Sequence, residues 1–423
     1  MKKIFTLLAV TIAFSVNAQT NTNTGTESLN DEDTGTNNSA FGYQSLKSNI
    51  SNKNSAFGAE SLEFNTTGFF NSAFGYQALQ SNTEAKSNSA FGHRSLTSNT
   101  TAEYNSAFGD LALEDNSTGG SNTALGYGVL KNNLEGKFNT AVGSRSMETN
   151  NSDYNTAVGA LALAGNNWLM SITNANHNTA VGYQALSKNE GSRNVATGSR
   201  TLKDNTSGND NVATGYYALN SNTTASFNTA YGSMSLYSNT GANNTALGYR
   251  SLFSNTTGSN NTAFGYKAEA SAASATNQTV IGYEATGQAD NSVVLGNDDV
   301  TAVYMGEDSG AKIYAGEASF NGDIVVSSDV RLKANIVSLG ATLAKLLLID
   351  GKTYTMKKGS KQKIGVLAQD IQEVFPELVS IDDKEMLAVN YLGLIPVLIN
   401  AMKEQEDKIS RLEGLVEKLI ANK

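Results

Sequence analysis

One twelve-residue phrase recurs along the first three quarters of this 423-residue chain. It reads NSAFGYQSLKSN at residues 38–49, NTAVGYQALSKN at 178–189 and NTALGYRSLFSN at 244–255. Taking the Gly of each A-x-G as an anchor gives sixteen copies from Gly42 to Gly296, with gaps of 16 or 17 residues apart from 23 before Gly182 and 14 at the end. A short fixed period predicts a solenoid in which each repeat packs only on its neighbours.

The composition of the repeat favours β-structure. The period is too short for pairs of helices, and Gly and Asn recur too often for a helix interior. We therefore expect a mainly β, parallel solenoid of short strands and turns. Leu stands four residues after the Gly from Leu46 to Leu252, with Met147 once, and we expect a second strand to carry this core column. Asn recurs four residues before and seven after the Gly, where stacked amides hydrogen-bond from coil to coil.

Two deviant copies indicate which residues share one side of the strand. Most copies resemble Thr140-Ala141-Val142, but Val195-Ala196-Thr197 and Val212-Ala213-Thr214 exchange the two flanking residues. Residues two apart lie on the same side of a strand, and we expect that side to be the coil interior. The Ala between them then faces outward. It never becomes larger between residues 40 and 263, so we expect another chain to pack there; the alternative is a flat surface without a partner.

The N-terminal sequence MKKIFTLLAVTIAFSVNAQT is typical of a secretory signal that is cut after Ala18. No later segment has the roughly 18 unbroken apolar residues of a membrane span. The net charge of -9 and the absence of a basic tract argue against nucleic acid as a partner. The chain has no Cys, which excludes disulfides and a lipidated Cys. We expect a secreted or surface-held protein.

Few residues offer metal or cofactor chemistry. With only His93 and His177 and no Cys, we expect no zinc or haem site and no cofactor. His177 and Trp168 lie in the extra segment before Gly182, which is either a simple insertion or a loop that contacts a glycan or a partner. A Tyr often follows the Gly, and this column either binds sugars or stacks on itself; its members include Tyr43, Tyr76, Tyr127, Tyr183, Tyr249, Tyr266 and Tyr283.

The composition changes after about residue 306, where Lys, Leu, Ile and Val replace the Asn-rich phrase. SLGATLAKLLLI (338–349) predicts a helix and GKTYTMK (351–357) a strand. A long helix is expected over residues 391–420. Its apolar residues alternate three and four apart, as in a coiled-coil seam, while the alternative is a helix that lies on its own domain. The seam consists of Leu398, Met402, Ile409, Leu412, Val416 and Leu419, with Gln405 in one core position.

The repeats, and especially QTVIGYEATGQADNSVVLG at residues 278–296, resemble the β-roll heads of trimeric autotransporter adhesins. The resemblance covers about residues 38–306 and implies a left-handed β-roll that forms trimers. Two features depart from the family. Most repeats are longer than the family's unit of roughly fourteen residues, and we expect no C-terminal membrane barrel.

Three motifs in the last quarter resemble the C-terminal intramolecular chaperone of phage endosialidases and tail fibres. They are SDVRLKANI from Ser328, GVLAQDIQEVFPELV from residue 365 and YLGLIPVLINAMKE from residue 391. The resemblance, over residues 328–423, implies a chaperone that assembles trimers and cuts itself off. It places the nucleophile at Ser328, the base at Lys333 and the scissile bond at Ser327–Ser328. A Lys acts as a base only when burial or a nearby cation lowers its pKa, and Arg331 is close in sequence.

The alternative is that Ser328 and Lys333 only help to form a domain that stays attached. The expected organisation is a signal peptide at 1–18, a linker at 19–37, the solenoid at 38–306, a junction at 307–327 and the chaperone at 328–423. We expect an exported homotrimeric fibre or adhesin that binds a surface glycan or a neighbouring cell surface.

Two other functions remain open. A tail-spike-like, phage-derived protein would bind or depolymerise glycans, although depolymerisation needs paired Asp/Glu residues and the sparse acids recur in no fixed column. A structural or ice-binding rod would favour aligned Thr on an exposed face, whereas the Thr before the Ala is expected to face inward.

Overall fold

The computed structural model describes residues 21–29, 35–165, 175–304, 321, 326, 328–357, 360–382 and 385–422. The predicted signal peptide, Trp168 and Ser327 lie outside the described residues. The chain divides into two compact units, Met1–Ala311 and Lys312–Lys423, and each is treated by itself below.

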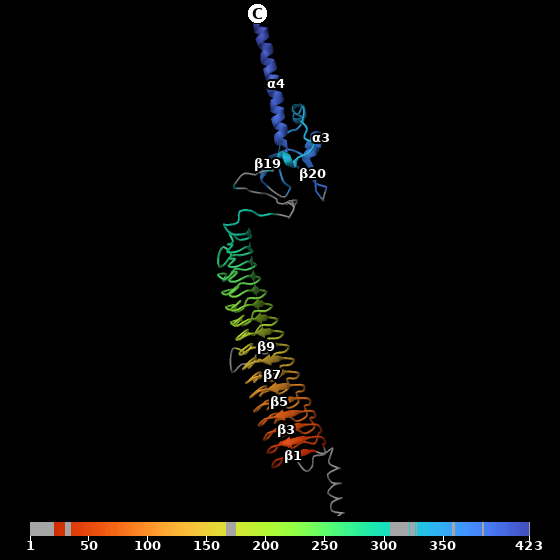
Figure 1. Cartoon of the computed structure of the whole chain (residues 1–423), viewed down its shortest axis with the longest axis vertical. Coiled ribbons are helices and arrows are strands. Elements are labelled where there is room, and N and C mark those ends of the chain that lie inside the picture. Colours follow the sequence, from red (N-terminus) through yellow and green to blue (C-terminus); the bar gives the residue numbers. More distant parts are fainter. Residues whose placement is uncertain are drawn as a thin grey trace, which may run out of the picture. The chain divides into compact units, whose positions relative to one another are not determined.

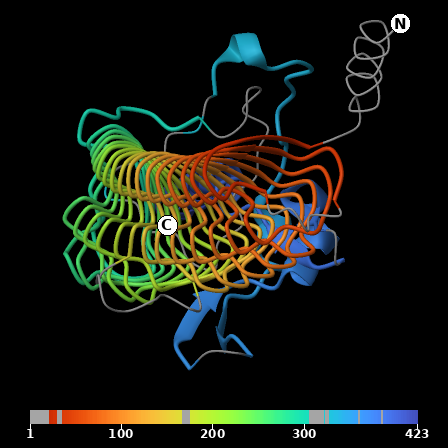
Figure 2. The same cartoon turned by 90° about the horizontal axis from the view of Figure 1, so that it is seen from below.

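The first unit is a parallel β-solenoid, as predicted (Figure 1). Its seventeen short strands form one sheet in which each strand pairs in parallel with the next, and the coils lie over one another when viewed along the axis (Figure 2). The strands are β1 (Thr22–Thr24), β2 (Ser39–Phe41), β3 (Ser55–Phe57), β4 (Ser72–Phe74), β5 (Ser89–Phe91), β6 (Ser106–Phe108), β7 (Thr123–Leu125), β8 (Thr140–Val142), β9 (Thr156–Val158), β10 (Thr179–Val181), β11 (Val195–Thr197), β12 (Val212–Thr214), β13 (Thr229–Tyr231), β14 (Thr245–Leu247), β15 (Thr262–Phe264), β16 (Thr279–Ile281) and β17 (Val293–Leu295).

The interior of each coil is formed by the Leu column and the Ala column. Leu113 and Ala107 are both fully buried, and their equivalents from coil to coil join them in one continuous cluster. The prediction that Ala faces outward is therefore wrong. Ala stays small because it fills the narrow interior against Leu, not because another chain packs on it.

The residues on either side of the Ala point outward. In β2 to β16 the middle residue is buried, while both flanking residues are half-buried or exposed. The exchange between Val195 and Thr197 does join two positions on one side of the strand, as predicted, but that side is the outer one. Thr and Val can trade places there because neither is confined by the packed interior.

The Leu column lies on a turn rather than on the expected second strand. Leu113 has a φ of 54°, in the left-handed region, and its equivalents in the other coils share this conformation. The N–H of Leu113 still donates to the carbonyl of Val129 in the next coil, at 2.9 Å. The anchor Gly92 has a φ of 145°, and a Cβ there would lie 2.2 Å from the carbonyl oxygen of Gly109. Only Gly allows this close approach between coils.

The two Asn columns link the coils as predicted. The backbone N–H of Asn88 donates to Oδ1 of Asn71 at 3.0 Å, and Nδ2 of Asn82 donates to Oδ1 of Asn65 at 2.7 Å. All four side chains are fully buried. A buried amide is costly unless it is paired, so each Asn requires its equivalent in the neighbouring coil.

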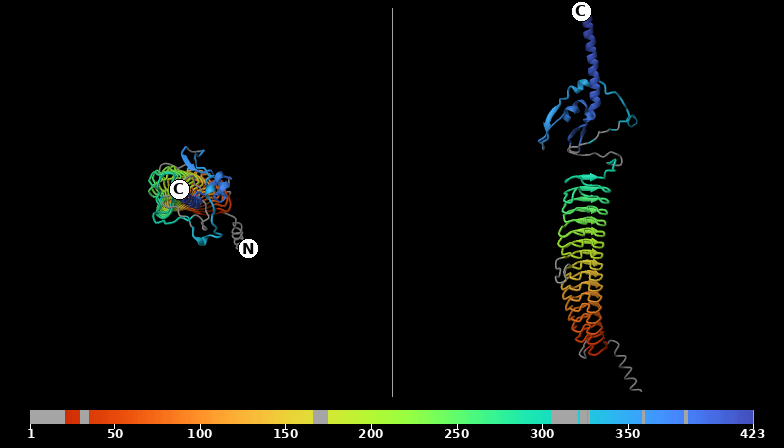
Figure 3. Two further views of the ribbon diagram at one scale, coloured as in Figure 1. Left: turned by 90° about the horizontal axis from the view of Figure 1, so that it is seen from above. Right: turned by 90° about the vertical axis from the view of Figure 1, so that its left-hand side faces the viewer.

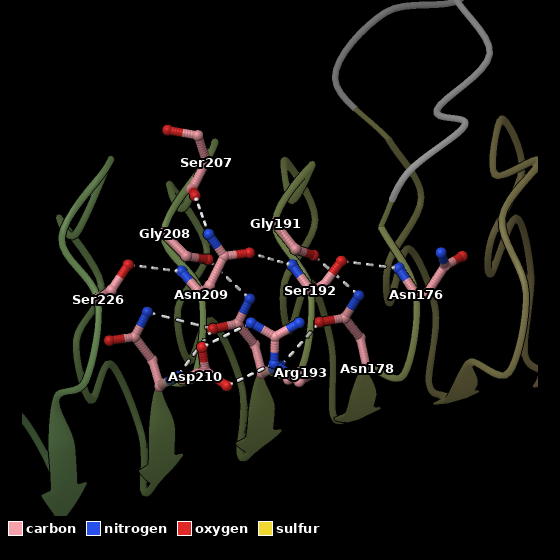
Figure 4. Close-up of polar contacts among 12 residues, drawn as sticks. Asn176, Asn178, Gly191, Ser192, Arg193, Ser207, Gly208, Asn209, Asp210 and Ser226 are labelled. Atoms are coloured by element: carbon pink, nitrogen blue, oxygen red, sulfur yellow. Dashed lines mark hydrogen bonds and ion pairs between the residues drawn. The ribbon is translucent and has the colours of Figure 1, made fainter.

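Side chains also cap backbone groups at the corner before the strands (Figure 4). The N–H of Asn176 donates to Oγ of Ser192 at 3.1 Å, and the N–H of Ser192 donates to Oδ1 of Asn209 at 2.7 Å. Beside this series of hydrogen bonds, Arg193 forms two hydrogen bonds with the carboxylate of Asp210 in the next coil. In these contacts, as in the Asn columns, polar groups of one coil are hydrogen-bonded by side chains of the next coil.

One further coil precedes the sixteen copies read from the sequence. Strand β1 pairs with β2, and Gly25 has a φ of 142°, like the other anchors. Asn21 and Leu29 occupy the Asn and Leu columns, but Asn23 replaces the Ala. The solenoid therefore begins inside the segment predicted as a linker, because this copy lacks the A-x-G signature.

The second unit is a small α+β domain that ends in a long helix (Figure 3). Ile371, Phe375 and Val397 form the centre of its core. The predicted strand at 351–357 is present as β18, whereas the predicted helix at 338–349 is reduced to α2. The elements are η1 (Val330–Leu332), α2 (Leu343–Leu346), β18 (Lys352–Thr355), β19 (Gln362–Gly365), α3 (Ala368–Val374), η2 (Pro376–Leu378), β20 (Val379–Ile381), β21 (Leu387–Val389) and α4 (Leu394–Ala421). Strands β18 and β19, and strands β20 and β21, form two antiparallel hairpins.

The inward position of the Ala column gives a direct test of the coil. We expect Ala141→Leu to destabilise the solenoid by about 1–3 kcal/mol, because extra methylene groups must enter a packed interior. Thr140→Val is the matched control, since Thr140 points outward and Val195 already occupies the same column. Urea denaturation of the full chain, followed by circular dichroism, measures both. If Thr140→Val lowered the free energy of unfolding more than Ala141→Leu, the assignment of Ala141 to the interior and Thr140 to the outer face would be contradicted.

Candidate functional site

The predicted nucleophile and base come together at one short turn. Asp329 caps the 3-10 turn η1 by accepting a hydrogen bond from the N–H of Arg331 at 2.8 Å. The turn places Lys333 at its end, where the N–H of Lys333 donates to the carbonyl of Val330. Lys333 Nζ consequently lies 2.5 Å from Ser328 Oγ, within hydrogen-bond distance. This is the nucleophile–base contact that a Ser–Lys pair requires.

Arg331 makes its contacts with Asp329. Its Nε and a terminal nitrogen lie 3.0 and 2.7 Å from the two carboxylate oxygens. The guanidinium holds the pKa of Asp329 below its ordinary value, chiefly through these side-chain hydrogen bonds. The sequence suggested that Arg331 could be the cation that helps Lys333 to act as a base. In the structure the carboxylate of Asp329 offsets the charge of Arg331, so this arrangement does not support that role. Asp329, which the sequence reasoning passed over, was detectable as a preferred capping residue.

Ser328 and Lys333 are both exposed in the single chain. Burial is one of the ways in which a protein favours the neutral form of a lysine, and an exposed side chain does not have it. The described part of the chain thus brings the two side chains into contact without burying them.

Helix α4 has two different halves. Near its start Val397 and Ala401 are buried against the domain, and Thr342 Oγ1 donates to the carbonyl of Val397 at 3.1 Å. From residue 405 onward almost every side chain is exposed. The predicted seam residues include Met402, Leu412 and Leu419, which are 70%, 61% and 69% exposed. The helix therefore lies on its own domain at one end and presents an unpaired apolar seam over the rest of the part that the structure describes.

Glu404 fastens α4 to the short helix α2. Its Oε1 accepts hydrogen bonds from the N–H groups of Thr342 and Leu343, the second at 3.2 Å. The Thr342 N–H is the main reason that the pKa of Glu404 is lowered. The sequence pattern did not single out Glu404, because on a helical wheel it is one of many exposed acids.

The other residues singled out from the sequence belong to surface stacks. His93 lies 2.8 Å from the Asp110 carboxylate and its ring stacks on Tyr76, while His177 stacks on Tyr154. Within the described ranges no group of three or more His, Cys, Asp or Glu residues is placed to hold a metal ion. Of the Tyr column, Tyr249, Tyr266 and Tyr283 stack face to face, which favours self-stacking there.

The comparisons with known proteins agree with these motifs. Residues 328–380 match the peptidase S74 family model described as the chaperone of endosialidase. Long tail fiber protein Gp37 is 33% identical over 97 residues in Escherichia phage AR1, 30% over 118 in Enterobacteria phage M1 and 29% over 137 in Enterobacteria phage Ox2. The matches cover 21%, 26% and 30% of this chain, and 9%, 47% and 53% of those relatives.

The chain is thus a β-solenoid followed by an endosialidase-type chaperone domain, with distant homology to phage long tail fibres. It spans about half or less of the length of these relatives. No helix in the part of the chain that the structure describes is long and apolar enough to cross a membrane.

The contact of Glu404 predicts a pH dependence. A carboxylate with a lowered pKa stabilises the fold fully above its ordinary value of 4.5, and this stabilisation is lost as the pH falls through the lowered value. We expect Glu404→Gln to lower the melting temperature of the helical signal at pH 7. The further loss between pH 5 and pH 3 should be smaller in the variant than in the wild type. Circular dichroism at 222 nm measures both quantities.

Glu406→Gln, on the exposed part of the same helix, is the control. Equal effects of the two substitutions would show that the bond to α2 contributes nothing.

Proposed function

We propose that this chain is a homotrimeric surface fibre whose C-terminal unit assembles three copies and then cuts itself off between Ser327 and Ser328. The observation that carries the proposal is the contact between Lys333 Nζ and Ser328 Oγ, at the first residue of the segment that matches the endosialidase chaperone. Fold alone would not support an activity, but a nucleophile and a base at this distance do.

The proposed cleavage follows from the atoms at the turn. The neutral amine of Lys333 takes the proton from Ser328 Oγ, and the oxygen attacks the carbonyl carbon of Ser327. The peptide C–N bond then breaks, the proton passes to the released α-amine of Ser328, and Ser327 is held as an ester. Water hydrolyses this ester, leaving a carboxylate on Ser327 and the hydroxyl of Ser328. Attack by the adjacent residue has a high effective concentration, so a single turnover needs little further catalysis.

The exposure of the pair explains how the cleavage would wait for assembly. In the single chain Ser328 and Lys333 are open to water. Packing of three copies around this turn would remove water and favour the neutral amine. Cleavage would then follow trimer formation rather than precede it.

Two apolar surfaces support association with further copies of this chain. The first is the seam of α4 from Met402 to Leu419, whose spacing is that of a coiled coil. The second is the outer face of the sheet. There Phe57, Phe74 and Phe91 stack at 4.6 Å along the axis, and Leu125, Phe264 and Leu295 continue the column with 49%, 51% and 47% exposure. Exposed apolar columns of this length mark an interaction surface.

Export and a role as an adhesin are part of this proposal. The signal-like start and the resemblance of the repeats to trimeric adhesin heads support them. The relatives support a second candidate, a phage-derived fibre that binds or depolymerises glycans, since they are phage tail fibres. A structural or ice-binding rod also stays open: the Ser/Thr column faces outward after all, although the column beside it is bulky and apolar.

Expression of the full chain tests the cleavage. We expect the wild type to yield a fragment that begins at Ser328, identified by mass spectrometry. Ser328→Ala and Lys333→Ala should stay full length while still forming trimers, because each removes one partner of the proton transfer. If the wild type forms a trimer of uncleaved chains, the proposed self-cleavage is ruled out. If Ser328→Ala is monomeric, the proposed trimer assembly is ruled out.

The helix seam can be tested separately in the uncleaved Ser328→Ala background. We expect Leu412→Glu to convert the trimer to monomers or aggregates in light-scattering measurements, because three like charges would meet at the seam. Arg411→Glu, next to Leu412 in sequence but outside the seam positions, should leave the trimer intact. If both variants remain trimeric, the seam does not hold the copies together.

A further inference from the structure

A continuous strip of aromatic rings, bounded by two guanidinium groups, lies on the turns that follow the anchors of three consecutive coils, and the coil before them supplies one of the guanidinium groups. The aromatic strip consists of Tyr216, Tyr217, Tyr237 and Phe253. The ring centroids are 4.3 Å apart for Tyr216 and Tyr217, 5.9 Å for Tyr217 and Tyr237, and 5.4 Å for Tyr237 and Phe253.

The two guanidinium groups contact the ends of the strip. Arg200 bonds to the Tyr217 hydroxyl and lies 5.4 Å from the centroid of that ring, and Arg250 lies 4.0 Å from the centroid of Phe253. Arg200 and Arg250 are three coils apart, which is ~14 Å along the axis.

Two of the three ring contacts in the strip differ from those of the other aromatic columns, while Tyr237 and Phe253 stack at 16° as the other columns do. Elsewhere, rings from successive coils lie nearly parallel, as in Phe57–Phe74 at 5° and Tyr266–Tyr283 at 8°. Parallel stacking covers the ring faces and leaves only edges to the solvent. Tyr217 and Tyr237, from successive coils, instead meet at 57°, and the adjacent residues Tyr216 and Tyr217 meet edge to face at 87°. Tyr216 is also 49% exposed, so this part of the surface offers ring faces to a ligand.

The coils that carry the rings are poor in charge, although Lys203 of the preceding coil lies near Tyr217 and Glu269 of the following coil accepts from the N–H of Ser254. From residue 211 to residue 266 the chain contains a single charged residue, Arg250, although the whole chain has 39 acidic and 30 basic residues. The remaining polar groups are the amides and hydroxyls of Asn, Ser and Thr. The amides and hydroxyls of this surface can pair with the hydroxyl groups of a ligand.

We propose that the aromatic strip binds a neutral polysaccharide chain, with its sugar rings against Tyr216 and Tyr237. The C–H groups on one face of a pyranose carry partial positive charge, which is attracted to the negative face of an aromatic ring. A guanidinium has five N–H donors, so Arg200 retains donors for sugar hydroxyls beyond its bonds to Gln184 and Tyr217.

This inference rests on the surface-binding part of the proposed function and not on the cleavage. The strip follows the anchor Gly, whereas the outer face of the sheet precedes it. Copies that pack through their sheets would therefore use residues other than those of the strip.

The competing explanation is that these rings only cover the corner of the coil and bind no ligand. Residues at the same positions of other repeats suggest substitutions that distinguish ligand binding from this structural role. Ser199 and Ser233 occupy the column of Tyr216 in the neighbouring coils, and Ser187 occupies the column of Tyr237. The double variant Tyr216→Ser/Tyr237→Ser should therefore fold like its neighbours. Tyr266→Ser is the matched control, because it removes a ring from the same column as Tyr216 within a parallel stack.

The experiment measures binding of the full chain, in the Ser328→Ala background, to immobilised dextran, mannan and galactan, with alginate and hyaluronate as acidic arms. We expect at least one neutral polysaccharide to bind. The double variant should bind it about tenfold more weakly, the change that a loss of 1.4 kcal/mol produces. The control should change it less than twofold, and 0.5 M NaCl should leave it unaltered.

Three outcomes would overturn the inference: no neutral polysaccharide binds, the double variant binds like the wild type, or only the acidic polysaccharides bind and salt removes them. Sizing of the same samples reports the trimer, so loss of the proposed assembly is seen separately. If the double variant unfolds, saturation-transfer NMR on the wild type decides. Irradiation of aromatic protons must then transfer to sugar C–H protons, and absence of transfer rejects the proposal.

Discussion

The hydrogen bonding of each coil to the next is the constraint on which the rest of the solenoid depends. Asn54 illustrates it: its N–H donates to Oδ1 of Asn38 behind it, and its Nδ2 donates to the carbonyl of Gly68 ahead of it. A buried amide left without these partners would destabilise the coil by ~1–3 kcal/mol. No coil is therefore stable alone, and the first coil that the structure describes departs from the consensus, with Asn23 in β1 in place of the Ala.

The period of the repeat and the Leu and Asn columns could be predicted because the same residue type returns at the same position of successive repeats. The side of the strand that faces inward could not. In a three-residue strand, a small middle residue between two variable ones fits either orientation, and the apolar Phe41 and Val142 resembled core residues. They are half-buried on the outer face of the sheet instead, while Ala40 is fully buried. The turn at the Leu column was also hidden, since residue type does not indicate a Leu with positive φ.

The candidate site divides in the same way. Ser328 and Lys333 were named through a resemblance over the whole motif, and their contact is a local consequence of five residues and one 3-10 turn. The sequence could not show which nearby group pairs with Arg331. In the structure its guanidinium pairs with the carboxylate of the capping residue Asp329. Glu404 acts across about sixty residues of sequence on Thr342. Contacts of this range depend on how the domain folds and leave no pattern in the sequence.

A single chain leaves three requirements unmet, and association would meet all of them at once. The seam of α4 lacks a partner helix, the outer face of the sheet exposes a column of apolar side chains, and Ser328 and Lys333 lie in water. The ladders that hold the coils together, however, run within one chain. A solenoid that has been assembled would consequently keep its register without the chaperone, whose contribution would be to the rate and order of assembly. If the C-terminal unit is removed after assembly, as we propose, the fibre would lose none of the hydrogen bonds within its coils and the assembly would become irreversible.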